Sequence, residues 1–285
     1  MKKTNESKYS RSRAQKPISC TVLSGTEEII NCWMTFEKKS RQYVHKSACQ
    51  ELSRRGSCGD AVALIEDLYN KIDANWMERK RVKAPSPENW RYKKMQGIAR
   101  NNKSPEKQLE RSIVQLLGDD WVNEVPTASG LTSSHALKRA NIDLVHRIRP
   151  ACYEFIELKI VSNHPLYAAI EIVRSGLLYI HARANQEQMK YSSTDNELLK
   201  ADEVRLRVLA PDQYYCGYDL GWFEKRLSAG IAKFVASAVQ TSQLRGSRLI
   251  VDFKFTAFPA GFQWDRGYGK EKLQAALNGV TPAFS

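Results

Sequence analysis

The sequence predicts an α/β protein in which a mixed β-sheet is flanked by helices and preceded by a helical N-terminal region. Two patterns support this fold class. Apolar residues recur at helical spacing before residue 104, and helical and strand-like segments alternate after it. The chain has 285 residues, of which 42% are hydrophobic and 26% charged, as is typical of a globular protein with one or two domains.

The N-terminal part divides into two predicted segments. Residues 1–17 are rich in basic residues and lack an apolar stretch, which indicates a mobile basic tail and no secretory signal. Residues 18–103 are predicted to form a helical, basic region that binds nucleic acid or a partner, with Asp60 as one N-cap. Residues 78–94 mix basic residues with Trp90 and Tyr92, which is typical either of a clamp on a nucleic-acid backbone or of a solvated linker.

The C-terminal domain is predicted to span residues 104–285. Ser104 followed by Pro105 is a typical helix start, and Gly118 is a typical helix end. The remaining elements are expected in the order β-β-β-α-β-α-β, at residues 120–125, 138–148, 151–161, 164–185, 203–210, 221–241 and 247–258. This order predicts a mixed sheet with helices on both faces.

The net charge of +13 is distributed unevenly along the chain. Residues 1–104 hold 22 Lys and Arg against 11 Asp and Glu, whereas residues 105–285 hold 22 against 20. Such a positive field favours a polyanionic partner, with nucleic acid preferred over an anionic membrane surface; the alternative is that the charge only aids solubility. No apolar run approaches the roughly 18 residues that span a membrane. The six cysteines form no CxxC pair, so we expect reduced thiols, a cytoplasmic location and no membrane partner.

Charged residues interrupt two of the predicted strands. In the segment NIDLVHRIRPACYEFIELKI (141–160), Asp143 lies in the first strand, and Glu157 and Lys159 lie on one face of the second. A hairpin through residues 147–150 would place Asp143 beside Glu157. Two neighbouring carboxylates repel each other, and a hard divalent cation relieves that repulsion. With an adjacent ammonium group, this arrangement suits phosphodiester hydrolysis; the alternative is a solvent-facing Glu–Lys pair of little energetic consequence.

Asp143 followed by Glu157-Leu158-Lys159 resembles the D…ExK signature of the PD-(D/E)xK nuclease superfamily. The resemblance covers about residues 104–257 and departs from the signature at Ile142, where the namesake pattern has proline. It implies a restriction-endonuclease-like core with the element order αβββαβ. The helix EKQLERSIVQLL (106–117) occupies the position of the first core helix, which often supplies a further acid.

The resemblance also implies roles for individual residues. Asp143 and Glu157 would bind Mg²⁺ or Mn²⁺, together with the carbonyl group of Leu158. Glu110, or Glu106 as the alternative, would hold a second metal or a metal-bound water. Lys159 would act on the attacking water or on the transition state. Replacing Asp143 or Lys159 with alanine is therefore expected to abolish cleavage with little change in thermal stability.

The implied activity is that of a Mg²⁺-dependent deoxyribonuclease, with endonuclease preferred over exonuclease and DNA preferred over RNA. Restriction, phage defence and DNA repair in bacteria are the processes that such nucleases serve. Two alternatives stay open. One is a nucleic-acid-binding or scaffold protein whose nuclease-like fold is inactive. The other is a nuclease subunit that is silent until a partner such as an ATPase or helicase activates it. A homodimer is a further possible assembly.

Overall fold

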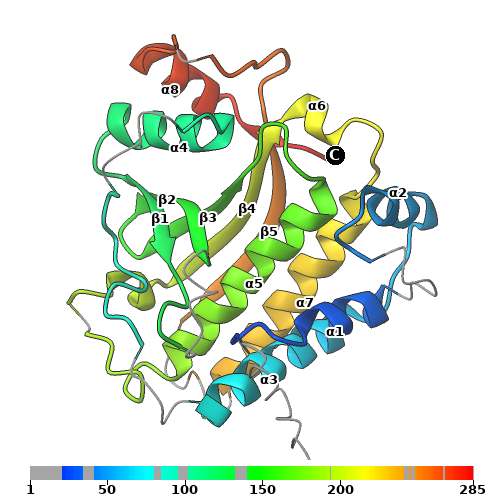
Figure 1. Ribbon diagram of the computed structural model, residues 1–285, viewed down its shortest axis with the longest axis vertical. Helices are drawn as coiled ribbons and strands as arrows, with labels where there is room; N and C mark the ends of the chain where they lie inside the picture. The colour runs from blue at the N-terminus through cyan, green and yellow to red at the C-terminus, as the bar shows by residue number, and fades with distance from the viewer. Residues whose placement is uncertain are drawn as a thin grey trace, which may run out of the picture.

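The computed structural model shows an α/β architecture built around a six-stranded mixed sheet flanked by helices (Figure 1). The residues that the structure describes are 21–34, 42–79, 85–95, 102–131, 140–192, 194–240, 244, 248–265 and 267–284. The predicted tail at residues 1–17 lies outside these ranges, as do residues 80–84 of the basic segment 78–94. The predicted α/β class is confirmed.

The helices lie close to the segments expected from the sequence. Their bounds are α1 Thr26–Trp33, α2 Lys46–Arg55, α3 Ala61–Arg79, α4 Pro105–Leu116, α5 Pro165–Ala184, α6 Asp212–Tyr215, α7 Gly221–Gln240 and α8 Lys270–Asn278. A 3-10 turn, η3, spans Glu197–Lys200. The short helix α6 and the C-terminal α8 are additions that the sequence did not indicate.

The strands follow one another across the sheet in chain order. Their bounds are β1 Trp121–Pro126, β2 Asn141–Arg149, β3 Cys152–Leu158, β4 Glu203–Pro211, β5 Ile250–Phe258 and β6 Thr281–Pro282. The pairs β1–β2, β2–β3 and β5–β6 are antiparallel, whereas β3–β4 and β4–β5 are parallel. Apart from the 3-10 turn η3 and the short helix α6, the order from residue 105 to β5 is α-β-β-β-α-β-α-β, as predicted.

Apolar side chains form a core on each side of the sheet. The larger core joins the sheet to α5 and α7, which run side by side along one face in Figure 1. The smaller core includes Leu109 and Ile113 of α4 and Leu273 of α8, packed against Leu144 and Ile156. Because both faces are covered, β3 is buried along most of its length, and a charged side chain at its end enters a largely desolvated site.

Local signals position the two helices nearest that strand end. The Ser104 hydroxyl group accepts a hydrogen bond from the Lys107 backbone N–H, and Pro105 occupies the first turn of α4. At α5, the His164 ring accepts a hydrogen bond from the Tyr167 backbone N–H, and Pro165 again follows the cap. These caps begin α4 and α5 beside the open end of the β2–β3 pair.

The N-terminal helices pack against the helices that cover the sheet. In Figure 1, α1 and α3 lie beyond α5 and α7, and their apolar residues belong to the larger core. A Cβ atom at Gly230 of α7 would lie only 2.9 Å from the backbone of Ala61 in α3, so the two helices approach each other closely there. Trp90 is fully buried against Phe155 and Tyr179, so its ring is neither exposed to a nucleic-acid backbone nor part of a solvated linker.

The described cysteines and helices bear on two further expectations from the sequence. The cysteines at positions 32, 49, 58, 152 and 216 are all free thiols. Within the described part of the chain, every helix is too short or too polar to cross a lipid bilayer.

Candidate functional site

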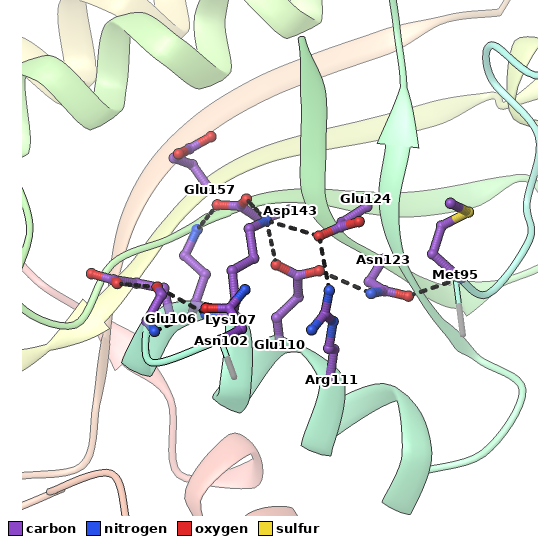
Figure 2. Close-up of polar contacts among 12 residues, drawn as sticks. Met95, Asn102, Glu106, Lys107, Glu110, Arg111, Asn123, Glu124, Asp143 and Glu157 are labelled. Carbon is purple, nitrogen blue, oxygen red and sulfur yellow. Dashed lines mark hydrogen bonds and ion pairs between the residues drawn. The ribbon is translucent and has the colours of Figure 1, made fainter. Parts of the chain in front are cut away.

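Three neighbouring strands each contribute one acidic residue at the same level of the sheet. The pairing of Leu144 with Ile156 places Asp143 next to Glu157. On the other side of β2, Asn123 pairs with Leu144 and Val125 with Ile142, which places Glu124 across from Asp143. Figure 2 shows Asp143 with Glu157 on one side and Glu124 on the other. The hairpin that the sequence suggested does bring Asp143 and Glu157 together.

Asp143 is held by a backbone group and by a lysine. Its Oδ2 atom accepts a hydrogen bond of 3.0 Å from the Leu158 backbone N–H, which ties the aspartate to the end of β3. Its Oδ1 atom lies 2.9 Å from Nζ of Lys107, which reaches over from the first turn of α4. The aspartate carboxylate is thereby oriented between two strands and a helix start.

Glu157 and Lys159 form a buried ion pair. Their Oε1 and Nζ atoms are 2.6 Å apart, and both side chains are only 9% exposed. Lys159 also lies 2.9 Å from Oε2 of Glu171 on α5. Burial and the neighbouring charge of Asp143 raise the pKa of Glu157 well above its usual value, in opposition to Lys159. Burial is the largest of these effects, and Lys159 acts against it by favouring the ionised form of Glu157.

Lys159 remains protonated in this setting. Burial lowers the pKa of its ammonium group, but Glu157, Glu171 and Asp143 together outweigh that effect and raise it. Lys159 is therefore a fixed positive charge. The burial also changes one sequence-based expectation, because Lys159→Ala would leave Glu157 buried without its counter-charge. We therefore expect Lys159→Ala to lower the free energy of unfolding, whereas the sequence alone predicted little change in thermal stability.

Glu110 lies beside Asp143, but other residues occupy both of its oxygens. Oε2 is 2.6 Å from Nζ of Lys107, and Oε1 accepts a hydrogen bond of 2.9 Å from the Asn123 amide. Burial raises the pKa of Glu110 to about 7, with Asp143 adding to the rise and Lys107 opposing it. In this arrangement Glu110 holds Lys107 in place, and both of its oxygens have hydrogen-bond partners, as both oxygens of Asp143 do.

Glu106, the alternative helix acid, binds the chain beyond β3. Its Oε1 atom accepts hydrogen bonds from the backbone N–H groups of Ile160, Val161 and Ser162, at 3.2, 3.3 and 3.2 Å. Burial would raise the pKa of this carboxyl group, but hydrogen bonds from the Ser162 side chain and from backbone N–H groups lower it to about 2. Glu106 thus fixes the segment that follows Lys159.

Removing Glu106 is expected to loosen that segment. Glu106→Ala should lower the free energy of unfolding by about 1.5–3 kcal/mol at pH 7, because a charged acceptor of backbone hydrogen bonds is lost. Glu106→Gln, which keeps a carbonyl oxygen, should lose less. Since folding lowers the pKa from 4.5 to about 2, the stabilisation is present above about pH 4.5 and disappears as the pH falls towards 2. Urea denaturation at several pH values measures this; equal stabilities of all three proteins at pH 7 would contradict it.

Asp143, Glu157, Glu124 and Glu106 line a cavity of about 620 Å³. Lys107 and Lys159 also line it, and α5 contributes Tyr167, Glu171 and Arg174. Arg174 donates a hydrogen bond of 2.9 Å to the Tyr43 hydroxyl group, and its guanidinium carbon lies 5.4 Å from the centre of that ring. The cavity therefore combines acidic and basic groups, as a site for a metal ion and a phosphate requires.

Sequence reasoning missed two residues of this cluster. The sequence did not indicate Lys107, because its partners Asp143 and Glu124 are distant in sequence. Its i, i+3 spacing to Glu110 was the signal that could have identified it. Glu124 adopts a left-handed backbone conformation with φ 49°, which breaks the strand alternation that would have assigned its side chain to a face. An acid inside the short predicted strand 120–125 was the only sequence signal for it.

The donor groups fit a hard divalent cation. Asp143 and Glu157 supply carboxylate oxygens, and Leu158 lines the same cavity. Within the described residues, no three His, Cys, Asp or Glu side chains converge closely enough to form a metal cluster. Mg²⁺ commonly binds through one or two carboxylates and keeps several waters, so two acids at the edge of a cavity meet its needs.

Comparisons with protein-family models, with curated proteins and with solved structures found no match to this chain. The residues of the cluster, their distances and their charges are therefore the basis for assigning a function.

Proposed function

We propose that the protein is a nuclease that requires a divalent metal ion and hydrolyses phosphodiester bonds in DNA. The observation that carries this proposal is the junction of Asp143, Glu157 and Lys159 at the end of a β-hairpin, beside a cavity of about 620 Å³. Carboxylates on adjacent strands with an ammonium group 2.6 Å from one of them provide both a cation site and a positive charge for a phosphate.

Each residue has a distinct role in this proposal. Asp143 and Glu157, with the carbonyl group of Leu158, hold Mg²⁺ or Mn²⁺. The ion would lower the pKa of a water molecule and stabilise charge on the phosphoryl oxygens. Lys159 keeps its proton, so it orients the water or neutralises charge in the transition state and does not act as a base. Glu171 holds the Lys159 ammonium group in position.

Two further features support the proposal. The elements α4, β1, β2, β3, α5 and β4 follow the αβββαβ order that the D…ExK resemblance implies for a restriction-endonuclease-like core. The excess of Lys and Arg in residues 1–104 favours a polyanionic substrate. We infer from these features that the chain is a PD-(D/E)xK nuclease acting on DNA, with endonuclease preferred.

A plasmid assay tests the proposal. Purified protein is incubated with supercoiled DNA at low salt, with Mg²⁺, Mn²⁺ or EDTA. We expect nicked and linear products with either metal and none with EDTA; digestion confined to linear DNA would indicate an exonuclease. Tight, salt-sensitive binding without cleavage in either metal would contradict the proposal and favour an inactive nucleic-acid-binding protein.

A further inference from the structure

The Lys107 ammonium group lies where acidic side chains from three elements converge. Its Nζ atom is 2.6 Å from Glu110 on α4, 2.9 Å from Asp143 on β2 and 3.6 Å from Glu124 on β1. Figure 2 shows these three contacts radiating from one nitrogen. Carboxylate oxygens from these three elements therefore balance the charge of the ammonium group.

The two lysines of the site divide its acids between them. Lys159 forms ion pairs with Glu157 and Glu171, whereas Lys107 forms ion pairs with Asp143, Glu110 and Glu124. Lys107 is therefore the positively charged partner of Asp143, the aspartate that we propose binds the metal. With the Leu158 N–H on Oδ2 and Lys107 on Oδ1, both oxygens of Asp143 already have partners.

We propose that Lys107 is an internal counter-cation that occupies Asp143 in the metal-free protein and competes with the divalent ion for it. This inference rests on the proposed function, because it concerns the same metal site. A lysine ammonium group and a divalent cation on one carboxylate oxygen repel each other strongly, so both cannot stay there at full occupancy. Metal binding through Asp143 therefore requires Lys107 to withdraw.

The structure gives Lys107 a position to withdraw to. Its side chain is 28% exposed and lines the cavity, and its flexible stem carries three donors on one nitrogen. After leaving Asp143 it keeps Glu110 at 2.6 Å and Glu124 nearby as partners. The competition keeps Asp143 neutralised without metal, and it weakens the apparent affinity for the ion.

Calorimetric titration with Mn²⁺ in the absence of DNA tests the proposal. We expect Lys107→Met to bind Mn²⁺ about tenfold more tightly than wild type, because the competing charge is gone. The single variant leaves Glu110 buried without a counter-charge and can fail to fold, so Lys107→Met/Glu110→Gln is measured as well. Glutamine keeps the contact with Asn123, and the double variant has the net charge of wild type. We expect the double variant to show the same gain in Mn²⁺ affinity.

Lys94→Met is the matched control. Lys94 has the same 28% exposure and one carboxylate partner, the exposed Asp119, so its loss changes the net charge equally without touching Asp143. Its Mn²⁺ affinity should equal that of wild type. Adding Asp143→Asn to the double variant should abolish the gain, which shows that the ion binds through the aspartate.

The possible outcomes separate this inference from the proposed function. If wild type binds Mn²⁺ through Asp143 but both Lys107 variants bind it no more tightly, Lys107 is only a structural partner of Glu110, and the proposed nuclease stands. If no variant binds Mn²⁺, both proposals fail. Binding that appears only after Lys107 is replaced, and that needs Asp143, supports the competition directly.

Discussion

Replacing Asp143 with asparagine is expected to reduce metal-dependent DNA cleavage by about three orders of magnitude, because the loss of charge stabilisation by the ion corresponds to about 4 kcal/mol. Asparagine has nearly the same shape, and its side-chain carbonyl can still accept the hydrogen bond from the Leu158 N–H. The hairpin end should therefore stay intact. Initial rates of plasmid nicking in Mg²⁺ measure the effect, and DNA binding in EDTA shows whether the substrate is still bound.

Asp120→Asn is the control for this substitution. Asp120 directly precedes β1 and pairs with Arg147 at the surface, away from the row of acids. Cleavage by this variant should be unchanged. If Asp143→Asn kept more than about a tenth of the wild-type rate, a metal site at Asp143 would be contradicted.

Replacing Lys159 with methionine should have the largest effect on stability. Loss of one partner from a buried ion pair leaves an uncompensated charge and typically costs about 3–5 kcal/mol. The pKa of Glu157 is already raised by burial and by Asp143, and without Lys159 it rises further. A carboxyl group whose pKa is raised by folding favours the folded state at low pH. The loss of unfolding free energy in Lys159→Met should therefore grow as the pH rises above the pKa of Glu157 in the unfolded chain. Denaturant titrations at pH 5 and pH 8 measure the difference.

A double substitution distinguishes the charge effect from lost packing. In Glu157→Gln/Lys159→Met both charges are removed, so most of the stability should return, while cleavage stays absent. Lys94→Met breaks only a surface pair and should leave the melting temperature unchanged. If Lys159→Met melted like wild type, Lys159 would not hold the buried charge described above.

The sequence predicted the α/β class and the positions of the main elements because the signals for them are local. Ser104 and Pro105 mark the start of α4, alternating apolar residues mark β2 and β3, and these elements were found at the expected positions. Trp90 was misjudged because its basic, proline-rich surroundings gave no sign that the ring packs beneath α5. Its burial depends on contacts between segments far apart in the chain.

The site was predicted only in part, for the same reason. Asp143 and Glu157 were paired correctly, since a short hairpin fixes which residues face each other. The separation of Glu106 from Glu110 was not predictable, because it depends on where α4 sits relative to β3. One of these acids binds the backbone beyond Lys159, and the other binds Lys107. In the sequence both are acidic residues of one predicted helix, so local sequence does not distinguish their roles.

We propose above that Asp143 and Glu157 hold a divalent ion at the end of the β2–β3 hairpin. Crystals of the protein soaked in Mn²⁺ test it most directly, through anomalous scattering of the metal. We expect a single strong peak bonded to both carboxylates, with Lys107 moved away from Asp143. A peak elsewhere in the molecule, or none at saturating Mn²⁺ with Lys107 still on Asp143, would contradict the claim.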